Sequence, residues 1–292
     1  MAKNSRYSLS PAFSLFYPIN VDEYFGKEID EREILTDYNF SLIPETLQSV
    51  RLFSAEELAR LDDLQYTFTR NIAGLSDFEY KRDMERLAID LSWKSSQIEG
   101  NTYSLLETER LLKDKQTAEG KTKDEAVMLL NHKDAIDFVV ANPDHFRMLN
   151  IAKIEELHSI LIKELGVDSN IRKRRAGIIG TNYRPLDNEF QIREALRDTC
   201  DLINGRNIVF EKALLALVLL SYIQAFTDGN KRVARILSNA LLIAANHCPL
   251  SFRTVDSVDY KKAMLLFCEQ NNISAFKQIF INQFEFAVEN YF

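Results

Sequence analysis

Two segments that are apolar on nearly every side, residues 208–223 and 233–245, restrict the fold more than any other feature of this chain. A helix with apolar side chains all round has to be covered by other elements on every face. Such segments therefore belong in the middle of a bundle. Nine glycines and six prolines among 292 residues leave few places for turns, which favours long helices. We expect an all-α fold, or one very nearly so.

The short polar loop between these segments has the composition of a phosphate site. Residues 224–235 read Gln-Ala-Phe-Thr-Asp-Gly-Asn-Lys-Arg-Val-Ala-Arg. Gly229 can take a positive φ, and the N–H groups that begin the following helix can form an anion-binding nest. Asp228 offers the hard oxygen that Mg²⁺ prefers beside phosphate. Arg232 and Arg235 lie three residues apart on one side of the helix, where both can contact phosphate oxygens.

This loop resembles the signature of the Fic family, whose usual form is His, any residue, Phe, any residue, Asp or Glu, Gly, Asn, Gly, Arg, two further residues and Arg. The resemblance implies a Fic-type helical bundle with a short β-hairpin flap. It also implies ATP as substrate or ligand, Mg²⁺, and transfer of AMP to a hydroxyl side chain of a target protein. Carried over residue by residue, it implies Asp228 as the metal ligand, Phe226 as a plug beneath the loop, and phosphate contacts from Gly229, Asn230, Lys231, Arg232 and Arg235.

Two positions depart from the family signature. Gln224 stands where the family has its catalytic histidine, and a neutral amide cannot accept a proton at physiological pH. General-base catalysis contributes roughly 10² to 10⁴ in rate, so we expect AMP transfer to be slow or absent. Lys231 stands where most members have the second glycine. The Doc branch of the family shares Asn-Lys-Arg here and transfers the γ-phosphoryl group, but it keeps the histidine, so Lys231 does not restore catalysis by itself.

A second stretch, residues 95–101, resembles the inhibitory motif of the family, which is Ser or Thr, three residues, Glu, then Gly or Asn. In members with this motif upstream of the core, the glutamate pairs with the second motif arginine and blocks the γ-phosphate position. The resemblance implies inhibitory roles for Ser95, Glu99 and Gly100, and an ion pair between Glu99 and Arg235. The alternative is an ordinary helix end stopped by Gly100.

Residues 177–190 differ in character from the helical segments. They combine apolar residues with Gly, Asn, Pro and Asp, which predicts a short β-hairpin. The hairpin matches the place of the family flap, whose edge strand holds a target by β-augmentation; an ordinary surface hairpin is the alternative. The basic run 172–175 just before it is either a solvated turn beside the site or a means of attracting polyphosphate or an acidic target. The flap resemblance implies target contacts from Gly177, Ile178, Ile179, Gly180, Thr181 and Asn182.

Capping boxes and apolar periodicity predict the remaining helices. Residues 1–50 lack a sustained period and are interpreted as an irregular arm that packs on the rest. We expect residues 1–110 to form an N-terminal helical region with the inhibitory helix, residues 111–250 the Fic core, and residues 251–292 two helices packing on that core. The predicted helices cover about 54–72, 76–96, 122–141, 150–165, 192–204, 255–271 and 273–291, in addition to the two apolar segments. A further helical piece is expected to begin at Ser104.

Charge and composition restrict the partners and the compartment. A net charge of −7 argues against a nucleic-acid binder. Three widely spaced cysteines indicate neither a disulfide framework nor a zinc site. The N-terminus lacks the apolar core of a signal peptide, and no apolar run is long enough to span a bilayer. We therefore expect a cytoplasmic protein without membrane or nucleic-acid partners, with a homodimer left open.

Three functional hypotheses remain at the level of sequence. The first is an impaired relative of the AMP transferases that still binds ATP and Mg²⁺. The second is an active enzyme with altered chemistry, transferring a phosphoryl or other phosphate-containing group. The third is a non-catalytic module that binds a peptide or protein. His158, on the helix before the flap segment, is interpreted as a structural histidine.

Overall fold

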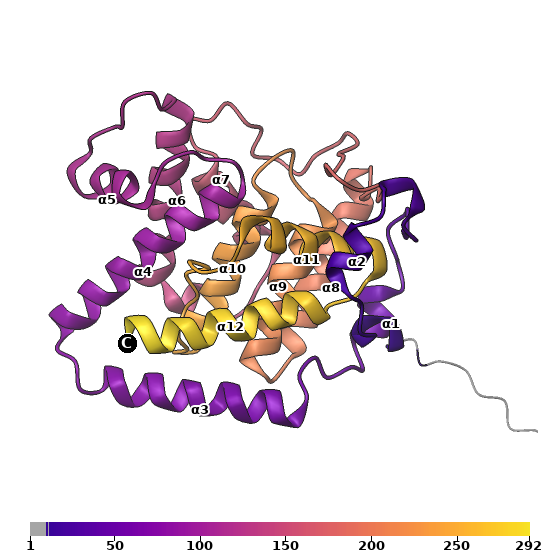
Figure 1. Ribbon diagram of the computed structural model, residues 1–292, viewed down its shortest axis with the longest axis horizontal. Helices are drawn as coiled ribbons and strands as arrows, with labels where there is room; N and C mark the ends of the chain where they lie inside the picture. Colours follow the sequence, from indigo (N-terminus) through magenta and orange to yellow (C-terminus); the bar gives the residue numbers. More distant parts are fainter. Residues whose placement is uncertain (1–9, 11) are drawn as a thin grey trace, which may run out of the picture.

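The computed structural model describes residue 10 and residues 12–292, and this part of the chain is mostly helical, with no regular β-strand (Figure 1). Helices α9 (Val209–Ile223) and α10 (Asn230–Ala244) lie at its centre and pack along each other. Every side chain from Ala213 to Ile223 is buried. The two segments that are apolar on all sides are therefore the middle of a bundle, as the sequence predicts.

The other long helices surround this central pair. Helices α4, α6 and α7 pack against α10. Helices α8 and α11 pack against α9, and α12 lies across α3 and α4 (Figure 1). The two helices that follow α10 in the sequence, α11 and α12, therefore pack back onto helices that precede it. The surrounding helices are α3 (Ala55–Ile72), α4 (Asp77–Ile98), α5 (Leu105–Asp114), α6 (Lys123–Ala141), α7 (Ile151–Leu161), α8 (Glu189–Gly205), α11 (Ser257–Gln270) and α12 (Ser274–Tyr291), with a 3₁₀ turn, η3, at Pro143–Phe146.

The predicted capping boxes fix the start of three of these helices. Ser54 accepts a hydrogen bond from the N–H of Glu57, whose carboxylate accepts from the N–H of Ser54. The reciprocal arrangement satisfies two N–H groups that have no partner inside the helix. The same pattern opens α5 and α6, and α4 begins in this way too. These predictions are confirmed.

The described part of the N-terminal arm is mostly irregular, as expected, and contains four short helical turns. Part of the expected arm, residues 1–9 and 11, lies outside the described residues. The described part packs on the bundle, since Leu15 and Leu47 have no exposed surface. Its turns are α1 (Phe13–Phe16), α2 (Val21–Phe25), the 3₁₀ turn η1 (Ile29–Glu31) and the π turn η2 (Leu42–Thr46).

The β-hairpin predicted for residues 177–190 is not formed. Residues 177–188 form a loop and residues 189–190 begin α8. The one backbone bridge of the loop joins Arg184 to Asp37 of the N-terminal arm in a parallel sense. Pro185 has no N–H to donate, which prevents a regular ladder along the second half of the segment. The loop consequently pairs with the arm, a distant part of the sequence, and not with itself.

One large hydrophobic cluster holds the described chain together. It runs from Leu15 in the arm to Tyr291 in α12. Its side chains come from all three of the expected regions, residues 1–110, 111–250 and 251–292. A smaller cluster, centred on Tyr103 and Leu111, joins α5 to α6. Within the described residues, no helix combines the length and the apolar character needed to cross a membrane.

Candidate functional site

The loop between α9 and α10 depends on two residues with left-handed backbone conformation. Gln224, directly after α9, has a φ of 54°, and Gly229, directly before α10, has a φ of 84°. A Cβ atom on Gly229 would lie 3.3 Å from carbon atoms of both His158 and Ile162. Only glycine meets both the conformational and the steric requirement at this position.

Replacing Gly229 by alanine should therefore destabilise the fold by about 2 kcal/mol, the upper end of the usual penalty for a left-handed residue, because the new methyl group also displaces its neighbours. Gly120→Ala is the matched control, since Gly120 has a φ of 74° but nothing within 4 Å of its Cβ position. Urea unfolding of both variants measures the difference. Equal losses of stability in the two variants would show that the close approach of the new methyl group to His158 adds nothing to the cost of the left-handed backbone.

The N-terminus of α10 presents free hydrogen-bond donors. In the described chain, the N–H groups of Asn230, Lys231 and Arg232 have no acceptor, and Gly229 has no side chain to cap them. Together with the positive end of the helix dipole, these donors favour an anion. The first turn of α10 is thus an anion-binding site in its backbone as well as in its side chains.

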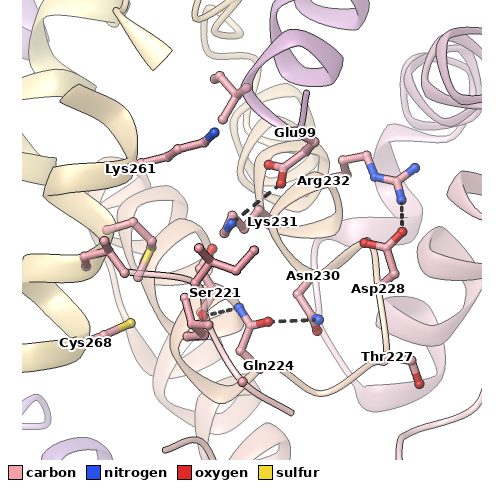
Figure 2. Close-up of a pocket in the computed structure, with 17 residues that line it drawn as sticks. Glu99, Ser221, Gln224, Thr227, Asp228, Asn230, Lys231, Arg232, Lys261 and Cys268 are labelled. Atoms are coloured by element: carbon pink, nitrogen blue, oxygen red, sulfur yellow. Dashed lines mark hydrogen bonds and ion pairs between the residues drawn. The ribbon is translucent and has the colours of Figure 1, made fainter. Parts of the chain in front are cut away.

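Asn230 holds the loop in shape from inside. Its side-chain oxygen accepts from the N–H of Phe226 at 2.8 Å, and its amide nitrogen donates to the carbonyl of Phe226 at 2.8 Å. The same nitrogen donates to Oε1 of Gln224 at 3.2 Å, while Nε2 of Gln224 donates to the carbonyl of Ser221 at 2.6 Å (Figure 2). The orientation of the Gln224 amide is fixed by this chain of bonds.

Arg232 is buried beneath the loop and paired with Asp228. Its NH2 donates to Oδ2 of Asp228 at 2.9 Å, and its NH1 donates to the carbonyl of Leu161 at 3.2 Å. The arginine side chain is 1% exposed, whereas that of the aspartate is 59% exposed. The pair therefore keeps one carboxylate at the surface of the loop, facing outward (Figure 2).

Arg235, one turn further along α10, is fully buried and contacts the end of α4. Its NH2 donates to Oε1 of Glu99 at 2.7 Å, and it also donates to the hydroxyl and the carbonyl of Ser95. The second carboxylate oxygen of Glu99 lies 3.6 Å from Nζ of Lys231. Burial alone would raise the pKa of Glu99, but the two cations outweigh it and hold the pKa below the usual carboxyl range.

Two residues outside the motif support the loop from behind. The His158 ring stacks on Phe226 with 3.7 Å between centroids, and its Nε2 lies 2.9 Å from the carbonyl oxygen of Asp228. Burial lowers the pKa of His158, which agrees with a structural role for a neutral ring. On the other side, buried Arg172 donates to the carbonyls of Gln224 and Leu186. Arg172 is therefore not part of a solvated basic turn, because its charge is used inside the fold.

A pocket of about 390 Å³ opens in front of these residues (Figure 2). The motif loop and Glu99 form one side, and the flap segment and α11 form the other. Lys231, Arg232 and Lys261 place three cations around a space that also holds two carboxylates. The lining residues from the end of α4, from α9, from the loop and from the start of α10 are Ile98, Glu99, Ser221, Gln224, Thr227, Asp228, Gly229, Asn230, Lys231 and Arg232; those from the flap segment and α11 are Gly177, Ile178, Ile179, Lys261, Met264, Leu265 and Cys268.

Comparisons with known proteins agree with this geometry. Residues 148–242, which include α7, the flap segment and the whole motif loop, match the model of the Fic/DOC family. The chain therefore contains a Fic domain. In solved structures, the fold resembles Fic-1 (residues 134–508) of Caenorhabditis elegans, with a TM-score of 0.70 at 21% identity over 81% of this chain and 72% of that one. A Fic domain containing signaling protein from Bacteroides thetaiotaomicron gives a TM-score of 0.66 at 18% identity, over 79% of this chain and 94% of that one.

Curated relatives carry the name protein adenylyltransferase. The protein adenylyltransferase Fic of Nematostella vectensis is 28% identical over 220 residues, which is 73% of this chain and 51% of the relative. The protein adenylyltransferase fic-1 of C. elegans is 26% identical over 170 residues, 56% of this chain and 33% of the relative. The chain thus spans about half or less of the length of these relatives, and its relation to adenylyltransferases is one of modest identity.

The structure brings most of the expected site residues of the Fic domain into one pocket. The expected residues that do not line it are Ser95, Gly100 and Arg235, together with residues 180–182 of the flap segment. Sequence reasoning missed the wall from α11, because α11 is far from the motif in sequence and has no recognisable signature. The one available signal was Lys261, a cation at the start of an otherwise apolar helix face.

Proposed function

We propose that this Fic-domain protein binds a nucleoside triphosphate, ATP being the natural candidate, with Mg²⁺ in the pocket at the N-terminus of α10, and that its capacity for AMP transfer is impaired. The observation that carries the proposal is the set of free N–H groups at residues 230–232, surrounded by the cations of the same turn. A polyphosphate chain meets both requirements at once, since it needs backbone donors and positive charge together.

Asp228 has the properties required of a metal ligand in such a site. No group of three or more His, Cys, Asp or Glu side chains in the described part of the chain could hold a metal ion. Mg²⁺ bound with a nucleotide takes most of its ligands from phosphate and water, so one exposed carboxylate is sufficient. When bound, the ion would neutralise phosphate charge. Arg232 would hold the Asp228 carboxylate in place through the ion pair between them.

The side chains of this chain account for binding better than for transfer. Asn230 keeps the loop closed around the phosphate position, and Lys231 would contact a phosphate oxygen once Glu99 is displaced. The attacking hydroxyl would lie near Gln224, which occupies the base position. Its amide accepts a hydrogen bond but not a proton, so a hydroxyl nucleophile is oriented without being deprotonated.

Glu99 would restrain the site, since it holds both Arg235 and Lys231 in the absence of nucleotide. Glu99→Gly should therefore raise the affinity for Mg²⁺·ATP at least about tenfold, the usual effect of one charge-assisted contact. Isothermal titration calorimetry measures the change. Glu119→Gly removes the same charge from an exposed turn and is the matched control. If the Glu99→Gly protein binds ATP no tighter than millimolar, the proposal fails and the peptide-binding module becomes the better hypothesis.

An active enzyme with altered chemistry makes a different prediction. Labelled phosphate would then be transferred by the chain with Gln224 intact, and this transfer would be lost on Asp228→Ala. Separate assays with ATP labelled at the α and the γ position identify the transferred group. Absence of transfer in both assays, combined with ATP binding, supports the impaired site.

A further inference from the structure

Arg32 of the N-terminal arm is a buried cation outside the region that matches the family. It lies just after the short turn η1, and its side chain is 3% exposed. The guanidinium stands over the ring of Phe25 at 5.0 Å. An arginine in such a place is held only where fixed acceptors satisfy its charge, because an unpaired buried charge is strongly unfavourable.

The acceptors of Arg32 come from two different walls of the pocket. Its NH2 donates to the carbonyl of Gly180, in the flap segment, at 2.8 Å. Its NH1 lies 3.2 Å from Oε1 of Glu269, in α11, and the glutamate side chain has no exposed surface. Tyr24, also in the arm, donates its hydroxyl to the other oxygen of Glu269 at 2.7 Å. The planar guanidinium suits this bridge, because one nitrogen donates to a carbonyl while another faces a carboxylate at ion-pair distance.

Both acceptors directly follow pocket-lining residues in the sequence. Gly180 follows Gly177–Ile179, and Glu269 follows Cys268. The two walls also touch at this point, since a Cβ atom on Gly180 would lie 3.4 Å from Cδ1 of Leu265. Arg32 therefore ties the flap segment to α11 where both walls meet behind the pocket.

Further contacts of the arm hold the same segment. The N–H of Arg184 donates to the carbonyl of Thr36 at 2.7 Å, and the Arg184 side chain pairs with Asp37 at 2.8 Å. The amide of Asn182 donates to Asp30 at 3.3 Å. These side chains are exposed and contribute little individually. The buried fork of Arg32 is the contact of this group that the solvent does not weaken.

We propose that Arg32 is a positioning residue of the pocket: through Gly180 and Glu269 it fixes the flap segment against α11 and so sets the wall that faces the phosphate site. The arm then belongs to the binding site although it touches no ligand. The effect on ligand affinity rests on the proposed nucleotide binding, whereas the effect on the flap segment does not.

The test removes the bridge without leaving an unpaired buried charge. Arg32→Met combined with Glu269→Leu replaces the pair by apolar residues of similar size, a change that is often neutral for stability. Hydrogen exchange of the full chain without ligand should show residues 177–184 exchanging at least about tenfold faster, while the melting temperature changes by only a few degrees. Affinity for Mg²⁺·ATP in the Glu99→Gly background should fall about fivefold or more.

A second buried pair supplies the matched control. Arg206 and Glu211 also join the arm to the bundle, through the carbonyls of Leu47 and Val50 and the N–H of Leu52, but they do not line the pocket in front of the motif loop. Arg206→Met with Glu211→Leu should leave exchange at residues 177–184 unchanged. Unchanged exchange in the Arg32 and Glu269 variant would overturn the positioning role. Absence of ATP binding in the Glu99→Gly background would instead refute the proposed function and leave the exchange result to decide the role of Arg32.

Discussion

Replacing Gln224 by histidine should raise the rate of AMP transfer by roughly 10²- to 10⁴-fold in a chain that also carries Glu99→Gly, because the missing general base is worth that factor. Histidine tolerates the left-handed conformation of position 224 better than most residues. The surrounding loop needs no other change, since Asn230 holds the backbone through Phe226 independently of the residue at 224.

The measurement is transfer of label from α-labelled ATP to protein, either to the chain itself or to proteins of a lysate. Glu99→Gly alone is the reference, and adding Asp228→Ala to the histidine variant should abolish the gain. Gln224→Asn is the matched control, because it changes the side chain at the same position without supplying a base. A gain below about threefold would show that the defect lies elsewhere, with Lys231 the first suspect.

The bundle could be predicted from the sequence because its signals are local or strongly periodic. A capping box such as Ser54 with Glu57 predicts a helix start from only four consecutive residues. The apolar residues on all sides of α9 predict that this helix lies in the middle of the bundle. The flap segment could not be predicted in this way. Its composition favours a hairpin, but its backbone partner is Asp37, about 150 residues earlier, and no local pattern encodes such a distant pairing.

The candidate site likewise has a contiguous part that could be predicted from sequence and distant contacts that could not. The loop from Gln224 to Arg235 is contiguous, so its turn, its donors and its charges are all readable from sequence. The contact between Arg235 and Glu99 could be inferred only through the family resemblance, and the structure contains it. Arg32 belongs to neither of the two motifs. A single arginine in an irregular arm gives no sequence signal that it will be buried.

Lys231 gives Glu99, the residue proposed to restrain the site, a second cationic partner beside Arg235. A glycine at this position would leave Glu99 with one cationic partner, whereas here the carboxylate has two, on successive turns of α10. Under the proposed function, this restraint would be correspondingly stronger before nucleotide binds, and a released Lys231 would become an extra phosphate contact afterwards. The same substitution would therefore raise both the barrier to nucleotide entry and the affinity of the opened site.

Arg235→Met should lower the free energy of unfolding by about 3 kcal/mol, within the usual range for breaking a buried ion pair. The arginine is fully buried and donates to Glu99 and to two oxygens of Ser95, all of which lose their partner. Urea unfolding at neutral pH measures the loss. Combining Arg235→Met with Glu99→Gln should recover part of it, because the carboxylate that has lost its partner is then neutral.

The pH dependence of the same loss tests its electrostatic origin. In the native chain, burial opposes ionisation of Glu99, but Arg235 and Lys231 prevail and depress its pKa. A carboxylate with a depressed folded pKa stabilises the fold above its unfolded pKa, and this contribution disappears as the pH falls through the folded value. The penalty of Arg235→Met should therefore shrink below about pH 4, near the ordinary glutamate pKa. A penalty that stays constant from pH 7 to pH 3 would mean that packing against Tyr260, and not the charge on Glu99, accounts for the stability that Arg235 provides.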